Sequence, residues 1–291
     1  MPFWLVLVMD KPLMFYYFCP LISFWFFFVY FSMFIMSNRN ASHPFMTKKF
    51  VCIFAFVLLF WVRFLPGDKS LFDLMFDYPS PLYYLIQENG SVAEWAFRSS
   101  LDKYAVPCGM LTAYVYIRLS SSGDIRDGSR NDNLFKSGTV NAVAAVGSVV
   151  LLGAYTMFAT TCVDKKECNS WHTVASPLMI GSFVLLRNVY GPFRGVVSRF
   201  FCFMGKISLE LFLLQCHVWL GSDTKGLLVI IPGAPVLNVV VTSLVFLYVS
   251  ILMHDITGAI AGVLLPSNLE GRALYMRVGG FVALCVGLYL L

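Results

Sequence analysis

The chain has 291 residues, of which 58% are hydrophobic and only 13% are charged. A soluble domain carries about 25% charged residues, so this chain has too little polar surface to cover a globular core, and a water-soluble protein is excluded. The formal net charge of +5 comes without any basic cluster interleaved with aromatic residues, which argues against a nucleic-acid partner.

Apolar segments long enough to cross a bilayer recur along the chain. A transmembrane helix needs about 17 to 25 mostly apolar residues. The candidate segments are residues 13–36, 50–65, 94–118, 140–162, 174–189, 200–220, 236–265 and 279–291, of which the third is polar in its first half and the last is short. We therefore predict an all-α fold, a polytopic transmembrane helical bundle with about eight spans in residues 13–291. Residues 1–12 are too short to span and resemble the end of a preceding segment.

Lysine and arginine are distributed unevenly among the predicted loops. The loops at residues 37–49, 118–137, 187–199 and 266–277 hold most of them, whereas those at residues 66–93, 163–171 and 221–235 hold few. Because cytosolic loops are enriched in these residues, the first set is predicted to be cytosolic and the second luminal. The sequon at Asn89 is then luminal, and the one at Asn40 is cytosolic and a chance match.

The eight cysteines form no C-x-x-C pair, so no metal site is expected. Cys162 and Cys168 flank one short polar loop. If that loop faces an oxidising lumen the two thiols can form a disulfide; otherwise they are small apolar side chains within the fold.

Charged residues within predicted spans are expensive in lipid, so each is a candidate functional residue. Glu94, Arg98 and Asp102 are spaced four residues apart, which predicts one helical face with alternating charge. A self-neutralised structural ladder and a catalytic group are both compatible with this spacing.

A second polar group lies in the span at residues 200–220. Lys206, Glu210 and His217 are spaced by four and seven residues, so a continuous helix would place them on one face as a polar stripe. A buried ion pair with a core histidine is the simple interpretation, but the cost of such a stripe in lipid favours function.

Three further features complete the candidate site. His172 lies at the luminal start of its span, and Arg187 and Asn188 lie at the cytosolic end of the same span, where an anchoring role and a phosphate contact are both open for Arg187. Since Glu94, His172 and His217 all fall at luminal helix ends, we expect a shared polar chamber on that side. The His254–Asp255 pair falls nearer the cytosolic side, at a donor entry or a helix break.

Three sequence strings resemble a known family. They are E-W-x-F-R-S-x-L-D-K-Y at residues 94–104, L-R-N at 186–188, and G-K-I-S-L-E-x-F-x-x-Q-x-H-x-W-L at 205–220. They resemble the multi-span sugar O-acetyltransferases, which include Golgi sialate O-acetyltransferases, fungal capsule-polysaccharide O-acetyltransferases and plant reduced-wall-acetylation proteins. Asn169, His172 and Ser176 are similar to an N-x-x-H-P-x-x-S stretch of that family, with Thr173 where proline is usual.

One departure from the family concerns its luminal domain. Many members carry an SGNH hydrolase-like domain before the membrane part, but this sequence has neither a G-D-S motif nor D-x-x-H. The plant members also lack that domain. The resemblance therefore still implies acetyl transfer, by this chain alone or with a separate luminal SGNH-type transferase as partner.

The resemblance implies a Golgi enzyme that moves acetyl from cytosolic acetyl-CoA to hydroxyl groups of luminal glycans. In that mechanism Arg187, Asn188 and Lys206 hold the donor, and His217 or His172 is the general base. Glu210 or Glu94 orients the base, and Arg98, in its charge ladder with Asp102, stabilises the oxyanion. A membrane transporter or acetyl-donor carrier, or a non-catalytic scaffold for a separate enzyme, is the alternative.

Overall fold

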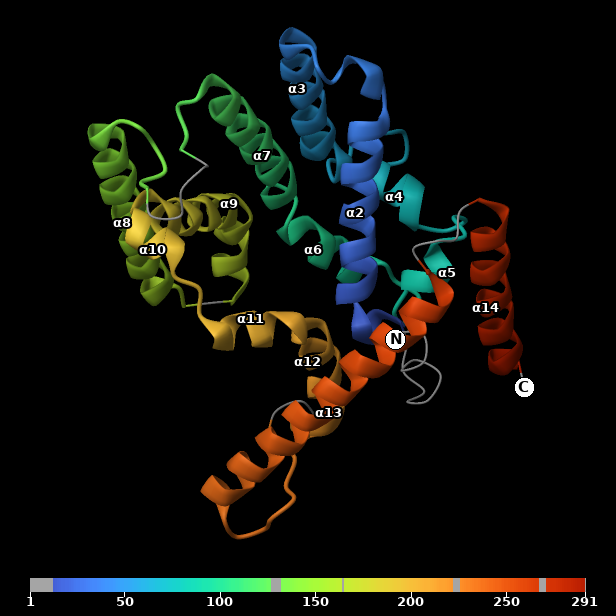
Figure 1. Cartoon of the computed structure of the whole chain (residues 1–291). Helices are drawn as coiled ribbons and strands as arrows, with labels where there is room; N and C mark the ends of the chain where they lie inside the picture. The colour runs from blue at the N-terminus through green and yellow to red at the C-terminus, as the bar shows by residue number, and fades with distance from the viewer. Residues whose placement is uncertain (1–12, 127–131, 164, 222–225, 267–270, 291) are drawn as a thin grey trace. The chain divides into compact units, whose positions relative to one another are not determined.

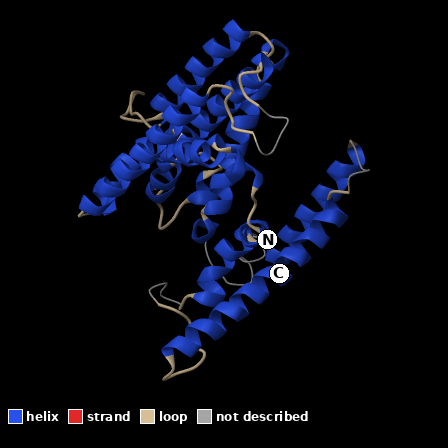
Figure 2. Ribbon diagram, turned by 60° about the vertical axis from the view of Figure 1, so that its left-hand side comes forward, coloured by secondary structure: helices blue, strands red, loops and turns tan. Residues whose placement is uncertain are grey.

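The computed structural model describes residues 13–126, 132–163, 165–221, 226–266 and 271–290. Within these ranges every regular element is a helix, and β-pairing is limited to isolated bridges (Figure 2). The predicted all-α class is therefore confirmed for the described residues. The predicted segment at residues 1–12 lies outside them.

The chain divides into two compact units, which we call the larger unit, Tyr17–Val197, and the smaller unit, Met1–Tyr16 with Ser198–Leu291. The larger unit contains α2 Phe18–Phe34, η2 Ser37–Arg39, α3 His43–Phe60, α4 Leu71–Phe76, α5 Tyr83–Ile86, α6 Ala93–Leu101, α7 Ala105–Ser122, α8 Gly138–Thr161, α9 Lys165–Val189 and α10 Gly191–Gly195 (Figure 1). The smaller unit contains η1 Leu13–Tyr16, α11 Arg199–Lys206, α12 Ser208–Leu214, the π-helix η3 Gln215–Trp219, α13 Pro235–Leu264 and α14 Arg272–Leu290.

Three described helices are long and apolar enough to cross a membrane, namely α3, α8 and α13. The pair formed by α11 and the α12–η3 segment makes a fourth if a span may be broken, and α2 and Ala273–Leu284 are shorter apolar helices. The prediction of about eight spans is therefore not confirmed. Side-chain exposure nevertheless agrees with a lipid environment, because only 6% of the apolar window of α8 is buried and Val143 and Met157 are more than 70% exposed.

The prediction of one continuous helix over residues 200–220 is wrong. The chain bends by 56° between α11 and α12 at Ile207. Gly205 and Ser208 flank the break, and the Ser208 hydroxyl donates to the Gly205 carbonyl at 3.0 Å. Glycine and serine are common causes of such kinks, since glycine is conformationally free and serine competes for backbone carbonyls.

The segment at residues 94–118 is likewise two helices rather than one. α6 ends at Leu101 and α7 begins at Ala105, so Asp102 lies at the junction between them. α9 is continuous from Lys165 to Val189 but contains Pro177, which cannot donate a backbone hydrogen bond. Figure 1 shows α9 changing direction along its length.

The core of the larger unit is built where α2, α3 and α7 meet. Met46, Phe50 and Ile53 are spaced three and four residues apart on α3 and are buried together. Side chains from α2 and α7, including Phe28 and Tyr114, pack against them. This apolar stripe gives α3 one face toward the unit and leaves its other face for lipid.

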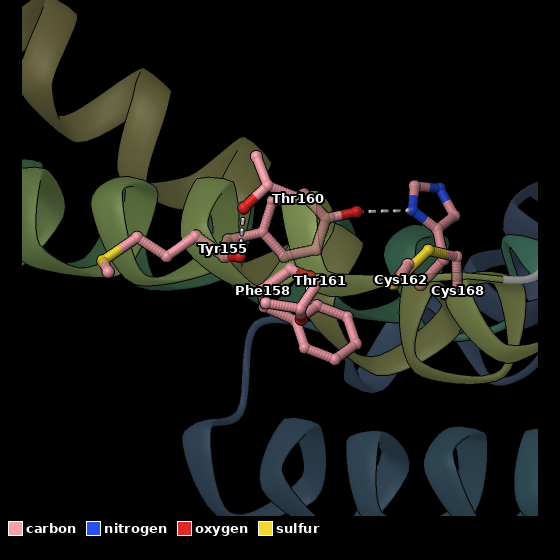
Figure 3. The surroundings of a disulfide bond; sticks show 8 residues. Tyr155, Phe158, Thr160, Thr161, Cys162 and Cys168 are labelled. Carbon is pink, nitrogen blue, oxygen red and sulfur yellow. Dashed lines mark hydrogen bonds between the residues drawn. A yellow bond between two sulfur atoms is a disulfide. The ribbon is translucent and has the colours of Figure 1, made fainter.

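The α8–α9 hairpin positions the first candidate site. The Ser137 hydroxyl caps the start of α8 by accepting from the Val140 N–H, and the hairpin closes with a Cys162–Cys168 disulfide whose Cα atoms lie 5.8 Å apart (Figure 3). Of the two interpretations left open for these cysteines, the structure has the disulfide.

Candidate functional site

In the larger unit, His172 lies on the first part of α9, a few residues after the disulfide. Its Nδ1 is 3.2 Å from the hydroxyl of Tyr155 on α8, and Figure 3 shows Tyr155 close to the Cys162–Cys168 bridge. The disulfide fixes how α8 and α9 pass each other at this end, so it also fixes the tyrosine relative to the imidazole. Tyr155 was not predicted, because a tyrosine in an apolar helix is typical of ordinary packing.

Asp102 is the charged neighbour of His172. The carboxylate lies at the α6–α7 junction, and both helices pack on α9. Burial raises the pKa of Asp102, and the electrostatic influence of His172 acts against that increase. An imidazole with a tyrosine at one nitrogen and a carboxylate nearby is suited to taking up a proton.

The predicted charge ladder on α6 is only partly correct. Arg98 Nε lies 2.7 Å from Glu94 Oε1, which confirms the expected pairing one turn apart. The guanidinium also lies 4.5 Å from the ring centroid of Tyr17, within cation–π range. Asp102 is not on the same helical face, because α6 has already ended at Leu101.

Ser176, the last residue of the N-x-x-H-x-x-x-S string, lies one turn beyond His172 on α9. Its side chain is buried, and its hydroxyl has no hydrogen-bond partner in the described part of the chain. A buried hydroxyl of this kind is usually bonded, so Ser176 is one of the exceptions.

Two of the residues predicted to hold the donor are engaged locally. The Arg187 guanidinium donates to the backbone carbonyls of Phe193 and Val196, and the Asn188 amide donates to the Val184 carbonyl at 2.8 Å. The two arginine bonds tie the end of α9 to the α10 region, whereas the Asn188 bond lies within α9. Lys206, by contrast, is exposed at the end of α11.

In the smaller unit, Glu210 and His217 do not pair with each other. Glu210 Oε1 lies 3.5 Å from His254 Nδ1, whereas His217 Nε2 lies 2.7 Å from the Tyr16 hydroxyl. The predicted stripe of Lys206, Glu210 and His217 on one face is wrong, because the break at Ile207 and the π-helix η3 both interrupt the helical repeat.

An open groove of about 500 Å³ also lies in the smaller unit, between α11, α12, η3 and α13. Its walls are mostly apolar and include Phe201 and Phe246, with Ser208 and Gln215 as polar members. Glu210 is not among the residues that line it. Trp219, which does line it, donates from Nε1 to the Ser243 hydroxyl at 3.1 Å.

The predicted luminal chamber shared by Glu94, His172 and His217 stays a prediction. The first two residues belong to the larger unit and the third to the smaller one. No group of three or more potential metal ligands occurs in the described ranges.

A protein family and a curated relative are similar to this chain. The family described as "10 TM Acyl Transferase domain found in Cas1p" matches residues 1–275. The N-acetylneuraminate (7)9-O-acetyltransferase of Danio rerio is 37% identical over 289 residues, which is 98% of this chain and 36% of the relative. The chain therefore spans about a third of the length of this curated relative. No solved structure matches.

Proposed function

Because the chain belongs to the family of acyltransferase domains found in Cas1p, we propose that it transfers acetyl from cytosolic acetyl-CoA to hydroxyl groups of luminal glycans. The observation that carries this proposal is the 37% identity to a sialate O-acetyltransferase across 98% of the chain. Sialic acid is accordingly the first acceptor to test. The proposed location is the Golgi membrane, with multiple passes.

His172 is the proposed general base. When Nδ1–H donates to the Tyr155 hydroxyl, Nε2 carries the lone pair that can accept the proton of an acceptor hydroxyl. The negative charge of Asp102 favours the imidazolium that then forms. His217, the other histidine expected to be the base, has its Nε2 engaged by Tyr16 and is the weaker candidate.

The remaining proposed roles are assigned from the charge of each side chain and the contacts it makes. Arg98 supplies positive charge for the developing oxyanion, and Glu94 holds the guanidinium in place. Lys206 is the best-placed contact for the donor's phosphates, since its ammonium is exposed. Arg187 and Asn188 would have to exchange backbone carbonyls for phosphate to take part, so we assign them to positioning the end of α9.

The test is transfer of label from acetyl-CoA to sialic acid by the purified chain in lipid nanodiscs. His172→Gln keeps a polar side chain but lacks a titrating nitrogen, so transfer should fall about 10²- to 10⁴-fold. His217→Gln is run in parallel. His43→Gln is the matched control, because His43 lies at the exposed start of α3 and should transfer at the wild-type rate.

Two outcomes would redirect the proposal. If His172→Gln and His217→Gln both transfer acetyl normally, the chemistry lies elsewhere and the chain is a scaffold for a separate luminal SGNH-type transferase. If label crosses the membrane but never reaches the sugar, the chain is a transporter or acetyl-donor carrier. Unchanged thermal unfolding of each variant shows that a lost rate is not lost protein.

A further inference from the structure

Glu210 is a deeply buried carboxylate in the smaller unit. Its residue exposure is 4%, and the helix face that carries it also buries Ile207 and Leu214. Its Oε2 atom has no hydrogen-bond partner among the residues that the structure describes. Burying a charged group without full compensation is costly, so the contact made by its other oxygen carries weight.

The partner of the other oxygen is His254 on α13. Oε1 lies 3.5 Å from Nδ1, the Glu210 side chain is 5% exposed and the His254 side chain is 42% exposed. The buried carboxylate therefore lies at ion-pair distance from one imidazole nitrogen, and the side chain that carries the other nitrogen reaches the surface of the unit. A carboxylate that orients an imidazole in this way is the arrangement used for proton transfer in acyl-transfer enzymes.

Glu210 does not orient His217, although the sequence spacing suggested that pairing. His217 Nε2 is engaged by the Tyr16 hydroxyl, and the Phe15 and Tyr16 rings lie 5.7 and 5.6 Å from the imidazole. In the described part of the smaller unit, Glu210 contacts the imidazole of His254 instead.

We propose that Glu210 and His254 act on the thioester end of a pantetheine-type acyl donor. His254 is the acid–base group and Glu210 is its positioning residue. The proposal rests on the acetyl transfer proposed above. It gives His254 an acid–base role, whereas the sequence offered a donor entry or a helix break at this position.

The chemistry of the donor matches the part-exposed imidazole. The leaving thiolate of a pantetheine-type thioester needs a proton, which an imidazolium nitrogen can donate. As the C–S bond breaks, the sulfur keeps the bonding electron pair and takes the proton from Nε2 of the imidazolium. The acyl carbon gains a C–O bond to the acceptor hydroxyl, and that hydroxyl's proton is released to water. Water returns a proton to Nε2, so the imidazolium is regenerated.

The position of His254 in the sequence supports the donor side. It lies in the half of α13 that precedes the arginine-containing loop at residues 266–277, which the distribution of basic residues assigns to the cytosol. Acetyl-CoA is a cytosolic compound in the proposed reaction. The competing explanation is a structural ion pair that joins α12 to α13, and the experiment has to separate the two.

The first measurement needs no variant. Diethyl pyrocarbonate modifies accessible imidazoles, and mass spectrometry of the peptide that contains residue 254 gives its rate of modification in the wild-type chain in nanodiscs. We expect coenzyme A or acetyl-CoA to slow modification of His254 at least about fivefold, and AMP to have no effect. If neither coenzyme A nor acetyl-CoA slows the modification of His254, the proposal is overturned.

The second measurement compares His254→Asn with His254→Gln. Asparagine retains a polar group near the position of Nδ1, facing Glu210, but lacks Nε2, so it rescues a structural pair and cannot rescue proton transfer. We expect both variants to lose about 100-fold in kcat with KM changed less than threefold, and Glu210→Gln to lose about tenfold. Tyr248→Phe is the control, since Tyr248 is exposed on the same helix, and its kcat should stay at the wild-type value.

The outcomes separate this proposal from the proposed function. Full activity in His254→Asn shows a structural pair only and overturns the acid–base role. Protection of His254 by coenzyme A in a chain that acetylates no sugar supports donor binding here while the proposed function fails. Sugar acetylation by a chain in which His254 is neither protected nor needed overturns the donor role and leaves the proposed function intact.

Discussion

Replacing Arg98 tests the electrostatic contacts of α6. Its guanidinium makes an ion pair with Glu94 at 2.7 Å and lies 4.5 Å from the centroid of the Tyr17 ring. Arg98→Ala removes both contacts. Arg98→Lys keeps a positive charge that can still reach Glu94, but it loses the planar group that stacks on the ring.

The magnitude follows from exposure. The Arg98 and Glu94 side chains are 29% and 43% exposed, so solvent screens the ion pair and its contribution is about 0.5 kcal/mol. A cation over an aromatic ring at this partial burial contributes about 1 kcal/mol. Arg98→Ala should therefore cost about 1.5 kcal/mol, and Arg98→Lys roughly half of that. For a chain of this size the larger loss lowers Tm by about 3–6 °C.

Thermal unfolding of the detergent-solubilised chain at one heating rate measures the shift in Tm. The reaction of its cysteines with a fluorescent maleimide monitors the unfolding. Arg63→Ala is the matched control: Arg63 also pairs with a carboxylate, Asp68, at 3.0 Å, but the two side chains are 64% and 77% exposed. Its Tm should change by less than 1 °C. Equal Tm values for wild type and Arg98→Ala would refute the reasoning. The reasoning would also be refuted if Arg98→Ala lowered Tm equally on the wild-type and the Tyr17→Leu backgrounds, because the stacking contact would then contribute nothing.

Three further predictions concern the larger unit. A glycan should be found on Asn89, which is exposed in a turn, and not on Asn40, whose amide donates to the Met33 carbonyl and accepts from Lys49; glycosidase-sensitive mobility of Asn89→Gln and Asn40→Gln decides this, and a glycan on Asn40 inverts the topology. Replacing both Cys162 and Cys168 by serine should cost about 2 kcal/mol, as the closed loop is short, and a Tm equal to wild type in oxidising buffer contradicts it. Burial raises the pKa of Asp102, so its contribution to stability is fully present below the pKa of an unfolded carboxyl and is lost as pH rises through the raised value. The Tm of Asp102→Asn should accordingly fall less than the Tm of wild type between pH 4 and pH 7. Identical decreases would contradict the raised pKa.

Local pairings were predictable from the sequence. The Glu94–Arg98 ion pair follows from a spacing of four residues within a single helix, and the structure contains it. The disulfide was one of the two interpretations that the sequence left open, because Cys162 and Cys168 are only six positions apart in the chain. Such contacts depend on one turn or one loop, which the sequence largely determines.

Contacts between helices were not predictable. Glu210 was expected to orient His217 because an unbroken helix would align them, but hydropathy gives no sign of a break at Ile207 in a uniformly apolar segment. Its actual partner, His254, is 44 residues away on α13 and meets it only through packing of α12 against α13. Tyr155 was missed for the same reason, since its link to His172 depends on how α8 and α9 pair.

The π-helix η3 restricts how many residues its turn can hold. The Leu220 N–H bonds the Gln215 carbonyl at 2.7 Å, five residues back, so this turn holds one residue more than an α-turn. Deleting one residue here would let α12 continue as an ordinary α-helix and rotate everything beyond by about 100° around the axis. Trp219 would then leave both the Ser243 hydroxyl and the Phe246 ring on which it stacks. In an evolutionary lineage of this chain, a gap between residues 215 and 219 would have to be matched by a compensating insertion.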